Sequence, residues 1–446
     1  MTSKFASPKK FAAALLCSTA VCPVLAQTVD IPRPPSRSSV DERGVDAASG
    51  ALLINDPQLS IGTSDTGLSY TRFWPGNNGW RNNYVISMKI DSTSHRTVTI
   101  GDSSTGFTLS GGVYVSDKGD GATLAPNPSP STGWTYVAPD GTSIDFSGTA
   151  VDTSGNPVSA VYYDSHTHYI ANWIKKPTGQ KIALHYESAN WLYMYNGDIV
   201  GENLVRLQSV TNSNGFQIKY NYADNSLAGH GGLSDPTAGP NWVRITNVTA
   251  INNGIDYCDP LADTCNGLTQ SWPSVSYSTA VSGTNTIESV TDEVGRVTQY
   301  ITDNATGSTH KLIGMRRPSS PSADSVTYGY DANGRISSVA VAGVGTWNYN
   351  FSLSGTTLTA SITTPSIPTP RTIVSDATIL QPTSITDENG YTSSFTYYYP
   401  DGHLKKEVHP EGNFLTYTYD SRGNLLCPNQ LRLSIYAFAQ SDHDLA

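Results

Sequence analysis

Charged residues are scarce in this chain. Only 14% of its 446 residues are Asp, Glu, Lys or Arg, whereas ordinary soluble domains contain about 25%. Acids outnumber bases by 37 to 27, which gives a formal net charge of −10. Nucleic-acid binding without sequence preference needs clustered Lys and Arg to replace counterions. The composition therefore predicts no nucleic-acid partner and a surface that is polar mainly through uncharged side chains.

Long hydrophobic runs are also missing, and no stretch after residue 26 is apolar enough to predict a transmembrane helix. Residues 1–26 have a basic start and an apolar run from Phe11 to Ala26, the pattern of a secretory signal peptide. Small side chains at Val24 and Ala26 predict cleavage before Gln27. Loss of three lysines and no acid would change the net charge from −10 to −13. We expect a secreted or cell-surface protein.

Cysteine is rare, with five in the chain. Cys17 and Cys22 lie in the expected signal peptide, and Cys427 lies near the end of the sequence. Cys258 and Cys265 form a close pair that no second pair or nearby His completes into a four-ligand zinc site. The pair therefore predicts a disulfide, with a metal site as the alternative. Closing so short a loop would contribute about 2–3 kcal/mol.

Motifs for catalysis are absent as well. The sequence has no nucleophile elbow, zinc-peptidase helix or phosphate-binding loop. A glycosidase needs two carboxylates about 5–10 Å apart, but here the acids begin turns, where they bond the backbone. These acids are Asp140, Asp331, Asp387, Asp401 and Asp420. We predict no enzyme activity, no catalytic residue and no cofactor.

Two short motifs leave a metal open as an alternative. His166 and His168 would share one face of a strand, either as a surface pair or as two ligands without a third. Residues 117–124, DKGDGATL, resemble a calcium loop but lack its closing Glu. We interpret the first motif as a surface strand and the second as a turn, so the sequence predicts no metal site.

Tyrosine and glycine are abundant, with 25 and 39 residues. Trp134 and Tyr136 alternate before Asp140-Gly141, and Ile144 and Phe146 alternate after it, a strong hairpin signal. Similar patterns surround Gly179 and Gly215. No useful window has apolar residues at helical spacing. The sequence predicts an all-β protein.

The turn pattern repeats near the end of the chain. The pair Tyr397 and Tyr399 and the pair Tyr417 and Tyr419 are 20 residues apart, and a fixed period of this size indicates a repeat architecture. We expect Phe395, Tyr397 and Tyr399 to share one strand face. Asp420 and Gly423 would form the turn after the last pair, because Gly enters the left-handed conformation cheaply.

The same tyrosine and turn motif occurs earlier in the sequence, and it resembles the repeat of a known family. Residues 328–336 read Y-G-Y-D-A-N-G-R-I, with Tyr328, Tyr330, Asp331, Gly334 and Arg335 at the marked positions. Residues 417–425 have the same residue types at the marked positions, except that Asn424 stands in place of Arg. This pattern resembles the YD repeat of the RHS (rearrangement hotspot) and teneurin-like families. The resemblance is convincing from Ser289 to Leu426 and looser from Gly44 to Tyr277.

The resemblance implies consecutive antiparallel hairpins that form a coiled β-strip, part of a hollow shell, after a β-rich N-terminal region. Some relatives enclose a C-terminal toxin, and others are adhesive. We expect a signal peptide at 1–26, a linker at 27–43, a lead-in region at 44–175, degenerate YD repeats at 176–426 and an aberrant tail at 427–446. The tyrosine period is lost in this tail. The loss has two interpretations: an ordinary C-terminal tail, or a repeat protein that was truncated or frameshifted.

The sequence is consistent with two candidate functions. The first is a non-enzymatic structural protein, the front part of a shell that encloses or presents a cargo or mediates cell-surface contact. The second is a carbohydrate-binding module whose exposed Trp and Tyr stack on an extracellular glycan. Aromatic side chains packed into a wall would favour the first, and an exposed aromatic row would favour the second. The sequence indicates no oligomeric state.

Overall fold

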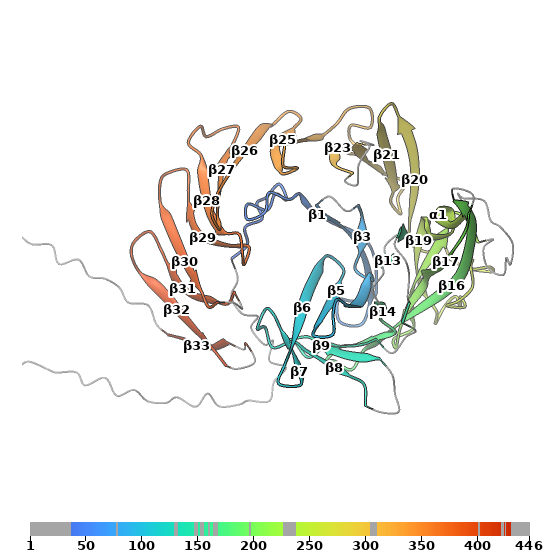
Figure 1. Ribbon diagram of the computed structural model, residues 1–446. Helices are drawn as coiled ribbons and strands as arrows, with labels where there is room; N and C mark the ends of the chain where they lie inside the picture. The colour runs from blue at the N-terminus through green and yellow to red at the C-terminus, as the bar shows by residue number, and fades with distance from the viewer. Residues whose placement is uncertain are drawn as a thin grey trace, which may run out of the picture. The chain divides into compact units, whose positions relative to one another are not determined.

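The fold is described from a computed structural model of the chain (Figure 1). The residues described are 37–76, 79–128, 133–146, 150–151, 156–158, 161–163, 168–195, 198–225, 238–303, 310–399, 402–420, 423 and 425–429. They are almost entirely β-structure, so the predicted fold class is confirmed. The one helix among them is short, α1 (Ala238–Val243). No helix in these ranges is long and apolar enough to cross a membrane.

Most strands belong to one large antiparallel sheet, which begins after residue 85. Its first strands are β4 (Ile86–Ile90), β5 (His95–Ile100), β6 (Ser103–Ser110), β7 (Val113–Ser116), β8 (Thr123–Pro126), β9 (Trp134–Val137), β10 (Ser143–Asp145), β11 (Ala150–Val151), β14 (His168–Ile170) and β15 (Trp173–Lys175). Two long strands and two shorter ones follow, β16 (Lys181–Tyr195), β17 (Asp198–Asn212), β18 (Phe216–Tyr222) and β19 (Ile245–Asn252).

The remaining strands contain the repeat motifs. They are β20 (Ser274–Ser282), β21 (Asn285–Thr291), β22 (Val297–Asp303), β23 (Leu312–Arg316), β24 (Val326–Tyr330), β25 (Ile336–Val341), β26 (Gly345–Ser354), β27 (Thr357–Thr363), β28 (Arg371–Asp376), β29 (Gln381–Thr386), β30 (Thr392–Tyr397), β31 (Leu404–Val408), β32 (Phe414–Tyr419) and β33 (Leu425–Asn429).

Neighbours in this sheet are neighbours in sequence. From β4 to β10, and again from β15 to β33, each strand pairs antiparallel with the next one, and Figure 1 shows them side by side in that order. Strand β10 pairs directly with β15, while β14 pairs with β4 and β11. The expected series of consecutive antiparallel hairpins is therefore confirmed, and we call this sheet the hairpin strip.

Two smaller sheets accompany the strip. Strands β1 (Leu53–Ile61), β2 (Leu68–Pro75) and β3 (Arg81–Asn82) form an antiparallel sheet of three strands. Strands β12 (Asn156–Val158) and β13 (Val161–Tyr163) form a hairpin inserted between β11 and β14.

The hairpins predicted around Asp-Gly and Asn-Gly turns form as expected. Tyr136 lies opposite Ile144, and Gly141 in the turn between them has φ +85°. The Asp140 carboxylate accepts the Thr142 N–H at 2.8 Å. Only Gly enters this left-handed region without strain, so the turn residues set the register of the flanking strands.

The main core lies on one face of the hairpin strip, which we call the inner face. Alternating residues of the strands point into it, as in β26, where Trp347, Tyr349 and Phe351 are buried and their neighbours are exposed. The first residues described also join this core, with Val45 fully buried and Leu52 1% exposed. Strands β30 to β32 form a smaller cluster around Phe395, Leu404 and Tyr417.

Candidate functional site: the packed faces of the hairpin strip

The repeat motif forms a closed turn between β24 and β25. The Asp331 carboxylate accepts the backbone N–H groups of Asn333 at 2.8 Å and Arg335 at 2.9 Å. Gly334 has φ +78°, and its N–H donates to the Asp331 carbonyl at 3.0 Å. The Arg335 guanidinium returns to the Asp331 carboxylate at 2.9 Å. These contacts lower the pKa of Asp331 against the opposing effect of its partial burial.

The second tyrosine of each motif bonds the strand before it. The hydroxyl of Tyr330 donates to the Leu312 carbonyl at 2.7 Å, and that of Tyr419 donates to the Leu404 carbonyl at 2.8 Å. In each case the residue after the accepting one is a β-bulge, which locally disrupts the hydrogen-bond ladder. The same bond joins Tyr222 to Leu207 and Tyr397 to Pro382. Tyrosine therefore provides a hydrogen-bond donor at these four bulges.

This geometry corrects one expectation. Strand β30 ends at Tyr397, and Tyr399 lies beyond it with 72% of its surface exposed. The prediction that Phe395, Tyr397 and Tyr399 share a strand face is therefore wrong for Tyr399. Tyr397 and Tyr419 each donate to a carbonyl beside a bulge in the preceding strand, so the structural equivalents of Tyr417 and Tyr419 are Phe395 and Tyr397.

Residues 37–67, which we call the N-terminal segment, run along the inner face in the reverse order of the strands. Its first residues contact β31, and its later residues contact strands that come progressively earlier in the sequence, ending at β17. The contacts are Arg37 with Glu407, Asp41 with Tyr349, the Gly50 carbonyl with the Ile336 N–H, Asp56 with Tyr300, Gln58 with Tyr277, and the Thr66 carbonyl with Asn212. One extended segment thus contacts many hairpins that are far apart in sequence.

The N-terminal segment uses the same turn chemistry as the repeats. The Asp41 carboxylate accepts the N–H groups of Arg43 and Val45, both at 2.9 Å, and Gly44 has φ +81°. The Asp-x-x-Gly pattern was visible in the sequence, but the region had been interpreted as the boundary between a linker and the lead-in region. Gly50 has φ +77°, and a Cβ there would lie 2.6 Å from the Arg335 Cβ.

Arginine side chains cover many of the aromatic rings. The guanidinium of Arg43 lies 3.9 Å from the Trp347 ring centre. Arg72 lies between Trp80 and Tyr277, at 4.3 and 4.8 Å. Contacts of this kind contribute about 0.5–2 kcal/mol, depending on burial.

None of the eight tryptophans is an exposed platform. Trp74, Trp191, Trp242 and Trp347 are buried, and the other four are partly covered. Trp134 is covered by Arg96 and Trp173 by Lys181, at 5.2 and 5.1 Å. An exposed row of indole rings, which the carbohydrate-binding alternative requires, is thus missing from the described residues.

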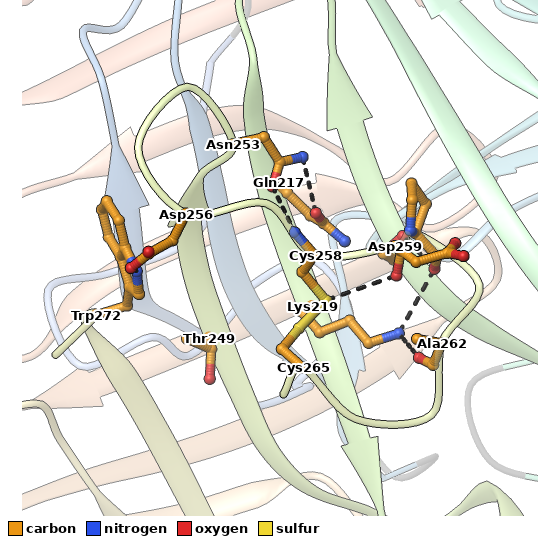
Figure 2. Close-up of a disulfide and its surroundings, with 12 residues drawn as sticks. Gln217, Lys219, Thr249, Asn253, Asp256, Cys258, Asp259, Ala262, Cys265 and Trp272 are labelled. Atoms are coloured by element: carbon orange, nitrogen blue, oxygen red, sulfur yellow. Dashed lines mark hydrogen bonds between the residues drawn. A yellow bond between two sulfur atoms is a disulfide. The ribbon is translucent and has the colours of Figure 1, made fainter. Parts of the chain in front are cut away.

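The disulfide loop, residues 253–273, contacts Gln217 and Lys219 of β18 (Figure 2), which alternate with Ile218 and Tyr220 of the main core, so the loop lies on the opposite face of the strip. Cys258 and Cys265 are joined by a disulfide in this loop. The Asn253 side chain donates to Gln217 at 2.9 Å and so ties the loop to β18. Asp256 accepts four hydrogen bonds, from the Thr269 hydroxyl and N–H, the Gln270 N–H and the Trp272 indole. These bonds, first the one from the Thr269 hydroxyl, lower the pKa of Asp256 to about 2.

The disulfide loop covers two buried cations. Lys219 is 1% exposed, and its ammonium donates to the Ala262 carbonyl in the loop. Burial lowers the pKa of Lys219 to about 8. The guanidinium of Arg206 donates to Glu187 and Asp263, both at 2.7 Å, and lies 4.3 Å from the Trp242 ring. Cations on this face are therefore stabilised by carbonyls and carboxylates that the loop helps to place.

Those of the other candidate residues that the structure describes lie apart in turns and strands. Strand β14 begins at His168, whereas His166, Asp401 and the expected signal peptide lie outside the described residues. Asp117 accepts the Thr108 hydroxyl at 2.7 Å and lies 3.0 Å from the His95 ring. Within the described part of the chain, no group of three or more His, Cys, Asp or Glu side chains is placed to hold a metal.

Gly423 of the last repeat has a role that the sequence did not indicate. It has φ +77°, and a Cβ there would lie 2.3 Å from the Gly119 carbonyl oxygen. The turn after β32 therefore contacts the turn after β7, although the two are separated by most of the chain. The Gly423 N–H donates to the Asp420 carbonyl at 3.0 Å, which closes the turn as predicted.

No family model matches the chain, and no curated protein matches it in sequence. Solved structures do resemble it. The Tc holotoxin pore of Photorhabdus luminescens is 10% identical, with a TM-score of 0.34 over 91% of this chain and 24% of that one. A TcdB2-TccC3-Cdc42 crystal structure is 9% identical, with a TM-score of 0.33 over 87% of this chain and 29% of that one. The chain thus spans about a quarter of the solved chains that it matches, and likeness at this level carries no argument about function.

Proposed function

We propose that the chain is a non-enzymatic structural protein, the front part of a β-wall that encloses or presents a polypeptide cargo outside the cytoplasm. The observation that supports this best is the N-terminal segment, which contacts successive strands of the hairpin strip in reverse order. A segment of this kind ties many hairpins into one core, because two-stranded hairpins alone are only marginally stable in water. The YD-repeat resemblance of the sequence points the same way.

The carbohydrate-binding alternative receives no comparable support. Sugar binding through stacked rings needs exposed aromatic faces, but Trp80 and Trp347 are stacked with guanidinium groups. Exposed tyrosines such as Tyr391 and Tyr399 lie at turns rather than in a row along one strand.

Export is part of the proposal. Residues 1–26 would be removed as a signal peptide, and the Cys258–Cys265 disulfide would form in the oxidising compartment that the exported chain enters. The proposed regions are a linker at 27–43, the lead-in at 44–175, the repeats at 176–426 and a tail from 427. Sequencing of the exported protein should begin at Gln27, and the peptide holding both cysteines should gain mass on reduction. Intact Met1 protein in the cytoplasm would contradict export.

The wall function is tested by isolating the exported chain from its native source after chemical cross-linking. A cargo-enclosing wall should bring with it a polypeptide that resists trypsin while the strip is folded. The same polypeptide should become sensitive in a Trp347→Ala variant, whose core is weakened, and stay resistant in a Tyr391→Ala control. A chain that is recovered without any associated polypeptide would overturn the proposal.

A further inference from the structure

A small cavity lies beside the N-terminal segment, where β2 and β3 meet the start of β19 and strands β20 and β21. Its volume is about 200 Å³. The charged part of its lining comes from Arg72, Arg81, Arg244 and Glu288, and Trp80 and Tyr277 provide aromatic walls. The cavity is not part of the turns and bulges described above.

The charge balance of the cavity differs from that of the chain. Three arginines and one glutamate line it, whereas the whole chain has a net charge of −10. The single carboxylate is already engaged, since both oxygens of Glu288 accept from Nη2 of Arg72, at 2.9 and 2.7 Å. Two positive charges therefore remain without a carboxylate in the cavity lining.

Arg81 is the cation of the cavity that lacks an acceptor. Among the described residues, its guanidinium has neither a hydrogen-bond nor an ion-pair partner, and it is only partly exposed. Arg72 is 5% exposed, and its Nη1 is fully buried without a hydrogen-bond partner, so this atom does not face the cavity. Burial by itself would lower the pKa of Arg72, but Glu288, Tyr277 and Tyr70 together outweigh it and the pKa is raised, so the group stays cationic.

We propose that this cavity binds a small carboxylate-bearing molecule. A planar carboxylate matches the forked donors of a guanidinium. The volume of about 200 Å³ has room for several water molecules and suits a small molecule of up to monosaccharide size. Val243 and Ile245 add apolar wall for the carbon skeleton. This inference goes beyond the structural role proposed above and does not depend on it.

Calorimetric titration of the full chain tests the proposal with charge-matched probes. D-Glucuronate should bind saturably, and neutral D-glucose, which has nearly the same size and shape, should give no binding heat. Acetate should compete with glucuronate, because the carboxylate is the recognised group. Absence of saturable glucuronate binding, or equal binding of glucose, would overturn the proposal.

Variants locate the binding in the cavity. Arg81→Gln should weaken glucuronate binding by about tenfold or more, as expected for losing one charge-assisted hydrogen bond. Arg371→Gln is the matched control, since Arg371 is also half-buried but lies in β28, outside the cavity. Circular dichroism and thermal unfolding should be the same for both variants. Equal glucuronate affinities in the two variants would assign any binding to another place and refute the proposed site.

Discussion

The hairpins of β24–β27 and those of β29–β33 contain the same turns and the same tyrosine-to-bulge bonds, yet they pack against different partners. The first group, which we call the covered hairpins, packs under the N-terminal segment and belongs to the main core. The second group, the terminal hairpins, has its own small cluster around Phe395, Leu404 and Tyr417. The segment reaches the terminal hairpins through Arg37. The comparison teaches that the repeat motif sets local geometry, whereas the size of the core depends on a segment far away in sequence.

The largest expected effect comes from removing a core ring in each group. Trp347→Ala and Phe395→Ala should each cost about 3–5 kcal/mol, because both rings are buried and large-to-small changes leave cavities. The part of the molecule that each substitution destabilises should differ. Amide hydrogen exchange should speed up through the N-terminal segment and β22–β27 in the first variant, but only through β29–β33 in the second.

Tyr391→Ala is the control for both, since Tyr391 is 62% exposed and isolated surface changes stay within about 0.5 kcal/mol. The comparison fails if Phe395→Ala speeds exchange in the N-terminal segment as much as Trp347→Ala does.

Turn glycines should behave alike in both groups, which sharpens the distinction between local and tertiary effects. Gly334 has φ +78° and Gly390 has φ +86°. Replacing either by Val should cost about 1–3 kcal/mol, the price of a strained backbone conformation. Chemical denaturation measures both, with exposed Thr418→Val as a control that should change little. A loss at Gly334 no larger than that at Thr418 would show that the hairpin register is wrong.

The tyrosine hydroxyls should contribute less to the free energy of unfolding than the core rings and the turn glycines. Tyr330→Phe and Tyr419→Phe each remove a donor to a carbonyl beside a bulge, so each should cost about 1–2 kcal/mol. Tyr399→Phe should have almost no effect, because Tyr399 is 72% exposed and lies outside the strand. Urea unfolding of the three variants checks this order, and a Tyr399 effect equal to that of Tyr419 would contradict it.

Alkaline pH should weaken both groups gradually. Burial raises the pKa of Tyr328 in the covered hairpins and of Tyr419 in the terminal hairpins to about 12. Since tyrosine in an unfolded chain has a pKa near 10, the unfolded state loses its proton first. The stabilising contribution is therefore fully present below pH 10 and is lost as pH rises toward 12. Tyrosinate absorbance should rise together with unfolding, and complete ionisation of a still-folded chain would disprove this.

The candidate site was only partly visible in the sequence. Asp331, Gly334 and Asp420 were placed correctly in turns, because turn chemistry involves residues only a few positions apart. Tyr399 was misplaced, because β30 ends at Tyr397, opposite a bulge in β31, and periodicity alone reveals neither the end of a strand nor a bulge. The cavity around Arg72 and Arg81 was not predicted, since its walls come from six elements that are far apart in the sequence.

The sequence by itself determined the all-β class, the positions of several hairpins and the Asp and Gly residues of their turns, since these depend on alternation and on Gly and Asp in short windows. Only the tertiary structure decided that residues 37–67 lie along the inner face, that Arg43 covers Trp347 and that Gly423 contacts Gly119. Such contacts join residues hundreds of positions apart. They depend on burying a shared apolar face, and neither of the two partners carries a local signal of the other.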